Sequence, residues 1–394
     1  MASPRPDPRH PVRVWTLLGH RAGDNNQVIA LAEALARRLG GTVEEKRLCY
    51  NPLSNIPNRL ADEGVFALKP ASRALLAAPW PDIVVGVGQR SVPVARWVKR
   101  QSGGRTRTVQ VGWPRCRPGL LDAVVTTPNY PVPGGDNVLR LSACMGRITP
   151  QRLAEGAEAC GAWRQRFPGP WSVLLVGGNS WPWRLDKAAL ATAVADLGAR
   201  ARANGGAVIV TTSRRTPKPM RDHLAALLAS CGAPSLLLGP EDCSPAHYPG
   251  LLALAADIAV TSDSVAMVSD ALESGKPVGL VPARASALGR MLLSALRPFH
   301  PGQDGDGHLP AAGWPLWRSR MAAAGLTDWW RDIGLFVELV QARGLAGTPA
   351  APRRCYLPHP APHAADWVVA RLGLCEVPAA PAPADGPTLV PALT

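Results

Sequence analysis

The sequence lacks several features that identify common functional classes. Its eight cysteines form no C-x-x-C pair and have no regular spacing, which argues against a four-ligand zinc site and favours buried free thiols in a reducing compartment. It contains no full G-x-G-x-x-G and no Walker A motif, which argues against a dinucleotide oxidoreductase and a P-loop NTPase. No apolar run approaches the roughly 20 residues of a transmembrane helix, and the N-terminal segment MASPRPDPRHPVRV has no apolar core of a secretory signal. We therefore expect a cytoplasmic protein.

Lysine is scarce in an otherwise basic chain. Lys and Arg together number 43 against 29 Asp and Glu, which gives a net charge of +14, yet only six of the basic residues are lysine. The arginines are spread along the chain rather than gathered in a stripe, and no nucleic-acid-binding motif is present. We therefore predict no nucleic-acid partner. The positive charge is consistent with a ligand that carries phosphate.

What the sequence does contain is a repeated alternation of apolar runs with helical patterns. Runs such as 12–18 and 83–88 are each followed by a segment with helical spacing of its apolar residues. The pattern starts again at WSVLLVGG, 171–178, and continues to 285. Uninterrupted Val/Ile/Leu runs indicate parallel strands that are buried on both faces. We predict an α/β protein with two Rossmann-like halves and a central cleft.

The same pattern sets the expected domain boundaries. The tail is rich in Pro and Ala, which predicts disorder over most of its length, apart from one short amphipathic piece, ADWVVARLGL. The five predicted parts are a disordered N-terminus (1–11), an N-terminal half (12–150), a C-terminal half (151–285), C-terminal helices (286–344) and the tail (345–394).

The most informative stretch is 257-DIAVTSDSVAMVSDALESGKPVGLV-281. A predicted strand ends in small polar residues, and a helical pattern follows that stops at Gly275. Ligands of doubly wound domains bind at the carboxyl ends of the strands, and a helix N-terminus at that place suits phosphate. We expect Ser262, Asp263 and Ser264 to line the substrate site, with Asp263 or Ser262 also able to cap the helix. We expect Asp270 to accept hydrogen bonds from a ribose. Spacing alone leaves open an ordinary capped helix with a solvated Asp270.

This stretch resembles the nucleotide-sugar motif of GT-B glycosyltransferases, in which an acidic residue five positions before the helix-ending Gly holds the ribose. Asp270 stands at that position in place of the usual Glu. Five blocks in the same order, covering roughly 12–285, are similar to the mitochondrial-fission "elongated mitochondria" family. They are GHRAGDNNQVIALAEAL (19–35), VGVGQRSVPVARWVKR (85–100), LLVGGNS (174–180), VTTSRRTP (210–217) and the stretch above.

Two further loops in the C-terminal half have residues suited to phosphate. VGGNS (176–180) is a glycine turn whose backbone N–H groups can approach a phosphate, although a turn that needs Gly only for its conformation remains the alternative. SRRTP (213–217) supplies two arginines that can pair with phosphate in a bidentate way, or a solvated loop. The predicted ligand contacts in these loops are Gly177, Gly178, Asn179, Ser213, Arg214, Arg215 and Thr216.

The N-terminal half has two comparable loops, at 19–27 and 86–91. An inverting glycosyltransferase needs a base for the acceptor hydroxyl, and Asp24 is the best candidate, with His20 as a weaker one. The family pattern favours Asp24 and the residues next to it over His20. The alternative is a loop that only caps the helix and takes no part in catalysis. The predicted acceptor-side contacts are Gly23, Asn26, Gln27, Gln89, Arg90 and Ser91.

The resemblance implies a glycosyltransferase that binds a nucleotide-diphosphate sugar in its C-terminal half. The acceptor would bind in the N-terminal half, and its identity is unknown. An acceptor in the cell envelope is one option. It implies no cofactor and no metal, and the D-x-D of Asp304 and Asp306 is not presented by any predicted strand end. Two rival functions stay open: a non-enzymatic adaptor that keeps the fold, and a sugar-nucleotide epimerase. Peripheral contact with the inner face of a membrane is a further expectation, based on the positive charge and on Trp314, Trp317, Trp329 and Trp330.

Overall fold

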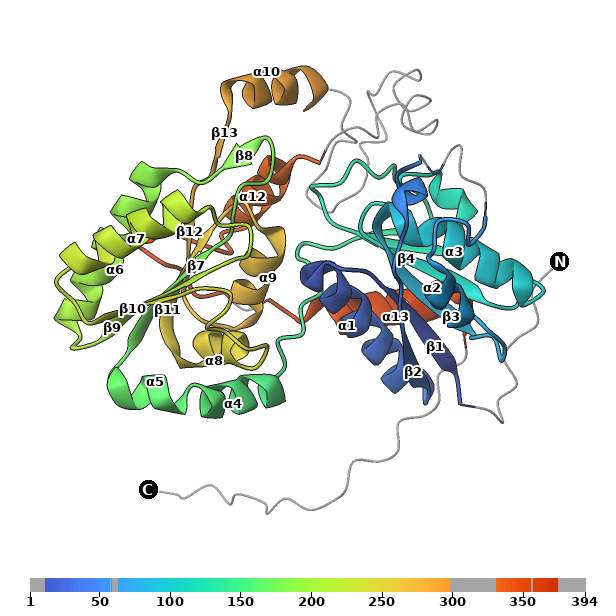
Figure 1. Ribbon diagram of the computed structural model, residues 1–394, viewed down its shortest axis with the longest axis horizontal. Helices are drawn as coiled ribbons and strands as arrows, with labels where there is room; N and C mark the ends of the chain where they lie inside the picture. Colours follow the sequence, from blue (N-terminus) through green and yellow to red (C-terminus); the bar gives the residue numbers. More distant parts are fainter. Residues whose placement is uncertain (1–10, 57, 59–62, 298–330, 356, 375–394) are drawn as a thin grey trace, which may run out of the picture.

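The computed structural model describes residues 11–56, 58, 63–297, 331–355 and 357–374. Figure 1 shows two α/β bodies side by side, each with a parallel sheet that has helices packed on it. The predicted fold class, an α/β protein with two Rossmann-like halves, is confirmed.

The N-terminal half contains a six-stranded parallel sheet in the order β2-β1-β3-β4-β5-β6. Because β2 lies on one side of β1 and β3 on the other, the strand order reverses between β1 and β3, and this is where such folds bind ligands. The strands are β1 (Arg13–Leu18), β2 (Thr42–Arg47), β3 (Ile83–Val87), β4 (Arg107–Val111), β5 (Ala123–Thr126) and β6 (Val138–Arg140), and the helices are α1 (Ala22–Leu39), α2 (Pro70–Ala74) and α3 (Gly88–Gln101).

The C-terminal half contains a five-stranded parallel sheet in the order β10-β9-β7-β11-β12, which reverses between β7 and β11. Its strands are β7 (Trp171–Val176), β9 (Ala207–Thr212), β10 (Ser235–Leu238), β11 (Ala255–Thr261) and β12 (Val278–Val281). A small antiparallel pair joins β8 (Trp183–Arg184) to β13 (Arg284–Ala285). The helices are α4 (Pro150–Ala159), α5 (Gly161–Arg166), α6 (Lys187–Ala203), α7 (Lys218–Ser230), α8 (His247–Leu254), α9 (Val265–Glu273), α10 (Ala287–Leu296) and α12 (Ile333–Ala342).

Alternate residues of one strand enter two different hydrophobic cores. Val173 and Leu175 of β7 pack in the core that includes α8 and α9, whereas Leu174 and Val176 pack in the core that includes α6 and α7. Every residue of β7 is therefore buried. This two-sided burial is the reason why the strand is an unbroken apolar run in the sequence.

The predicted disorder of the tail is wrong for residues 345–355 and 357–364, whereas the amphipathic piece that was excepted from it, 365–374, forms most of a helix. Residues 347 and 353 form bridges to β12, and α13 (Pro360–Leu372) packs against α1 in the N-terminal half (Figure 1). The helix buries apolar residues at helical spacing: Ala361, Ala364, Ala365, Val368 and Val369. The amphipathic pattern of 365–374 indicated the C-terminal part of this helix, whereas average composition missed the residues before it. Residues 375–394 lie outside the described part of the chain.

One helix crossing depends on two facing glycines. In the contact of α4 with α8, a Cβ on Gly250 would lie 2.1 Å from the Gly156 carbonyl oxygen, and a Cβ on Gly156 would lie 2.4 Å from the Gly250 nitrogen. We expect Gly156→Ala to lower the free energy of unfolding by about 1–3 kcal/mol, because the helices must move apart. Urea denaturation would measure it. Gly161→Ala is the control, since a Cβ there meets nothing within 4 Å. Equal stability of the two variants would contradict the close crossing.

Candidate functional site

The two strand-order reversals face each other. The first turn of α1 follows β1 in one half, and the first turn of α9 follows β11 in the other. These turns lie close together, because a Cβ on Gly23 would be 3.8 Å from the Cβ of Ala266, and Figure 1 shows α1 and α9 side by side. The loops predicted to bind donor and acceptor therefore lie on the facing sides of the two halves.

The glycine turn after β7 packs against the end of β11. The Gly177 N–H donates to the Thr261 hydroxyl, and the Gly178 N–H donates to Oδ2 of Asp263, both at 2.8 Å. A Cβ on Gly177 would lie 2.3 Å from that carboxylate, so only glycine permits the contact. Asn179 accepts the Leu185 N–H through Oδ1 at 3.1 Å. Both N–H groups that we expected to face a phosphate thus have partners inside the chain, and their contact with a phosphate stays a prediction.

The predicted cap of α9 is also wrong. Ser264 is the N-cap residue and makes no side-chain cap hydrogen bond. The Ser262 hydroxyl instead accepts the Ala283 N–H at 2.9 Å, and Asp263 turns back to the glycine turn. Burial raises the pKa of Asp263, and the Thr261 hydroxyl, the Gly178 N–H and Arg215 partly offset that effect. The first-turn N–H groups of α9 therefore have no side-chain cap.

The loop after β9 braces the same glycine turn. The Ser213 hydroxyl donates to the Gly177 carbonyl at 2.8 Å, and the Thr216 hydroxyl donates to the same oxygen. The Arg215 guanidinium lies 3.7 Å from the Asp263 carboxylate and 3.5 Å from the Gly178 carbonyl. Arg214 is exposed. Of the two arginines, Arg215 is the one directed at the strand ends.

Asp270 lies against the segment that links the two halves. A Cβ on Gly146 would be 2.4 Å from Oδ1 of Asp270, and burial raises the pKa of this carboxyl to about 7, with the Tyr248 hydroxyl lowering it in part. One turn later, Glu273 accepts the Gly146 N–H at 3.2 Å. Burial and the charge of Asp270 raise the pKa of Glu273 to about 8. Asp270 is therefore not a solvated residue, and its contact with a ribose stays a prediction.

Asp24 stands in the first turn of α1 with its side chain 36% exposed. Burial raises its pKa, and the charges of Arg21, Arg331 and His20 lower it in part. A carboxylate with a raised pKa is a stronger base. The loop before it is held by Asn25, whose side chain accepts the Gly19 N–H and donates to the Gly19 carbonyl, both at 2.9 Å.

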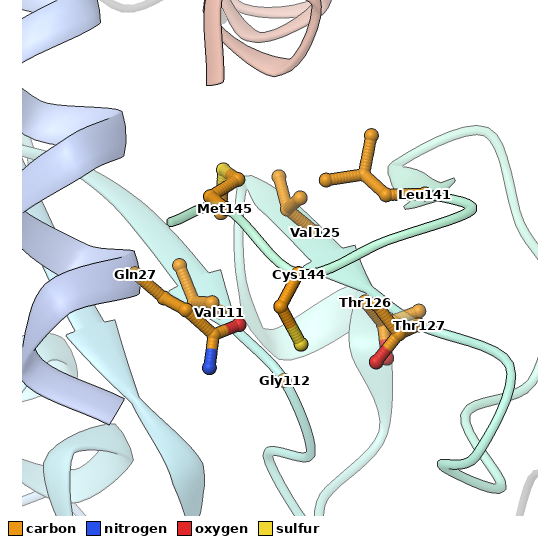
Figure 2. A pocket seen from close by; sticks show the side chains of 9 residues that line it. All are labelled: Gln27, Val111, Gly112, Val125, Thr126, Thr127, Leu141, Cys144 and Met145. Atoms are coloured by element: carbon orange, nitrogen blue, oxygen red, sulfur yellow. The ribbon is translucent and has the colours of Figure 1, made fainter. Parts of the chain in front are cut away.

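A small hollow opens beside α1 at the ends of β4 and β5. Figure 2 shows Gln27 of α1 and Cys144 of the linking segment reaching toward the same space, near Gly112, Thr126 and Thr127. The Thr126 hydroxyl is buried and makes no hydrogen bond with any described residue. Gln27 is thus placed at a polar recess in the N-terminal half, whereas His20, Gly23 and Asn26 are exposed.

The polar side chains of the loop after β3 make hydrogen bonds within the N-terminal half. Gln89 donates to the Ile56 carbonyl at 2.8 Å and accepts from Arg115 at 3.2 Å. Ser91 is buried and donates to the Val87 carbonyl at 3.0 Å. Contrary to expectation, Ser91 therefore has no surface to offer a ligand. Arg90 is partly buried, and its charge acts on the buried Tyr50.

Arg331 is the functional candidate that sequence reasoning missed. Its guanidinium donates to the Ser180 hydroxyl in the loop after β7, and it interacts with Tyr130 and Asp24 of the other half. The cation thus connects the candidate donor loop to the candidate base. Sequence gave little signal for it, because arginine is common in this chain and residue 331 lies far from any recognised motif. Tyr130, one of only four tyrosines, offered a weak signal.

Several sequence predictions fall outside the described residues: the N-terminus to residue 10, Asp304 and Asp306, and Trp314, Trp317, Trp329 and Trp330. Within the described ranges, no group of three or more His, Cys, Asp or Glu side chains could hold a metal ion. No helix in those ranges has the length and apolar character needed to cross a membrane.

Comparison with known proteins gives a family match. The sequence profile described as mitochondrial fission ELM1 matches residues 22–296. The chain is 26% identical over 276 residues to "Mitochondrial fission protein ELM1" of Arabidopsis thaliana, covering 63% of each chain, so it spans less than two thirds of that relative. It is 21% identical over 304 residues to the uncharacterized protein RP120 of Rickettsia prowazekii (strain Madrid E), covering 68% of this chain and 82% of that one.

Solved structures with a similar arrangement include the UDP-GlcNAc 2-epimerase of Neisseria meningitidis bound to UDP-GlcNAc, at 13% identity and a TM-score of 0.43, covering 92% of this chain and 99% of that one. A second is the glycosyl transferase family 9 protein of Veillonella parvula DSM 2008, at 8% identity and a TM-score of 0.44, covering 87% and 98%. Likenesses at this level carry no argument about the substrate of this chain.

Proposed function

The chain belongs to the mitochondrial fission ELM1 family, as its five sequence blocks predicted, and from this premise we propose that it is a glycosyltransferase that uses a nucleotide-diphosphate sugar. The observation that carries the proposal is Arg331. Its side chain donates to the Ser180 hydroxyl in the loop after β7, and its charge lowers the pKa of Asp24 in the facing half. A cation between a candidate phosphate site and a candidate base fits group transfer across the two halves.

In the proposed reaction, the donor diphosphate lies near the N-terminus of α9, Arg215 and Arg331. Asp24 removes the proton from an acceptor hydroxyl, and the acceptor oxygen attacks the anomeric carbon of the sugar. The bond from that carbon to the diphosphate breaks, and the nucleoside diphosphate leaves. Helix N–H groups and the two arginines stabilise the negative charge that develops on the leaving group. In other transferases a metal ion provides this stabilisation.

A second candidate function has its own support. The N–H groups of Gly177 and Gly178 are bonded to side chains of the same chain. A protein that kept the fold and lost the donor site would have the same arrangement. The rival function is therefore a non-enzymatic adaptor that keeps the fold.

Thermal unfolding with a panel of nucleotide-diphosphate sugars separates the two functions. We expect one nucleotide class to raise the melting temperature, because a ligand of the folded state stabilises it by mass action. The rise should be lost in Arg215→Ala and kept in Arg214→Ala, since only Arg215 faces the glycine turn. The neighbouring arginine is a matched control that removes the same charge. No rise with any nucleotide at millimolar concentration would favour the adaptor.

A further inference from the structure

The contacts of Asp263 are unusual for a carboxylate whose only role is to hold two loops together. Its side chain is fully buried, and Oδ2 accepts the Gly178 N–H at 2.8 Å. Oδ1 is also buried and has no hydrogen-bond partner among the described residues. Arg215 stands 3.7 Å from Oδ2, which is longer than a hydrogen bond, and 47% of its side chain is exposed. The carboxylate is therefore incompletely satisfied.

The groups around this carboxylate are the donors that proteins use for phosphate. They are a peptide N–H of a glycine turn, an arginine, and the N-terminus of α9, whose first turn has no side-chain cap. All three converge at the strand-order reversal between β7 and β11, where ligands of such folds bind. A phosphate oxygen and a carboxylate oxygen compete for these donors, and their like charges exclude simultaneous binding.

We propose that Asp263 is an internal competitor of phosphate: its carboxylate takes the position of a donor phosphate, which binds only by displacing it from the Gly178 N–H. This inference rests on the proposed function, because it assigns a role to a residue of the same donor site. It also reconciles the two findings about the glycine turn. The turn keeps the geometry of a phosphate site, and its donor is held by a side chain that the ligand replaces.

The burial of Asp263 agrees with a displaceable group. A buried carboxylate oxygen without a hydrogen-bond partner costs free energy, which weakens the state in which Asp263 holds the Gly178 N–H. Burial accordingly raises the pKa of this carboxyl above its ordinary value. A permanent brace between the Gly178 N–H and β11 needs only a neutral acceptor, such as the Thr261 hydroxyl that already serves Gly177. Competition with phosphate therefore explains why this residue carries a negative charge, whereas a purely structural role does not explain it.

The test is the affinity for UDP and for inorganic pyrophosphate, measured by titration calorimetry on the full chain. Asp263→Asn keeps an oxygen acceptor for the Gly178 N–H and removes the charge. We expect it to bind both probes about tenfold more tightly than the natural sequence, because a like charge has left the site. Asp257→Asn is the matched control. It removes one buried carboxylate from β11, the strand that leads to Asp263, but that group pairs with Arg200 and bonds to Ser172 rather than to the glycine turn.

Asp263→Ser is a second variant, in case the Asn form does not fold. Its shorter neutral side chain withdraws from Gly178 and should also tighten binding. Unchanged or weaker binding by a folded Asp263 variant, with the natural sequence still binding UDP, would overturn the competition and leave the proposed function standing. If neither the natural sequence nor the variants bind either probe, the proposed function fails and the competition fails with it.

Discussion

Replacing Asp24 with Asn is expected to lower the turnover of the nucleotide-diphosphate sugar by roughly 10²-fold or more, the usual contribution of a general base. The amide keeps the shape of the side chain in the first turn of α1 but cannot accept the proton of the acceptor. Because the residue is proposed to act in the chemical step, kcat should fall while KM for the donor changes little. The measurement is release of nucleoside diphosphate from the donor that gives the largest thermal stabilisation.

The pH dependence of the same reaction gives an independent check. Burial raises the pKa of Asp24 above its ordinary value, so the rate should fall with decreasing pH at a higher pH than an exposed Asp would show. Glu155→Gln is the control, because it removes an exposed carboxylate on α4 that belongs to neither candidate loop. Turnover of Asp24→Asn within twofold of the natural sequence would exclude Asp24 as the base. His20→Ala would then be the next variant, since His20 is the other candidate at this loop.

The free energy of unfolding is expected to fall as the pH rises from about 6.5 to about 8.5. Asp270 and Glu273 have pKa values of about 7 and about 8 in the folded chain, well above those of carboxyls in an unfolded chain. The folded state therefore binds more protons than the unfolded state, and rising pH favours unfolding. This stabilisation is fully present below a pH of about 4 and is lost as the pH passes the folded pKa values. The two titrations are coupled, because the charge of Asp270 raises the pKa of Glu273.

Urea denaturation at the two pH values would measure this fall, and replacement of both acids isolates its source. In Asp270→Asn/Glu273→Gln the difference between the two pH values should shrink strongly. Glu155→Gln, an exposed carboxyl on α4, should leave the difference unchanged. The chosen range avoids the acid titration of His359, which lies 3.3 Å from Glu273 and has a lowered pKa. A pH-independent stability of the natural sequence would show that the pair is already solvated.

The arrangement of these acids also explains how the two halves are joined. The Ser269 hydroxyl accepts the Cys144 N–H at 2.9 Å, and Glu273 accepts the Gly146 N–H. Two hydrogen bonds, one helical turn apart, therefore fasten α9 to the linking segment at 144–146. The helix that opens at the candidate donor site is the same helix that holds this linker.

Much of the fold was determined by the sequence alone. The unbroken apolar runs of β7 and β9 predict strands buried on both faces, and their alternation with helical patterns predicts parallel sheets. Parallel strands place their carboxyl ends at one edge, so the loops at 19–27, 176–180 and 261–264 were expected to lie at binding edges. These inferences depend on local periodicity and on a topological rule, which is why they needed no coordinates.

The tertiary structure alone decided how the polar side chains are used. Asp263 could cap its own helix or bond a neighbouring loop, and the choice depends on β7 lying beside β11. Asp270 is half-buried because a segment more than 120 residues earlier in the chain packs beside it, next to the Cys144–Ser269 hydrogen bond at a separation of 125 residues. Arg331 and α13 reach the N-terminal half only because the chain crosses back to it. Local pattern cannot reveal such contacts, since burial and pairing are properties of segments that meet only after folding.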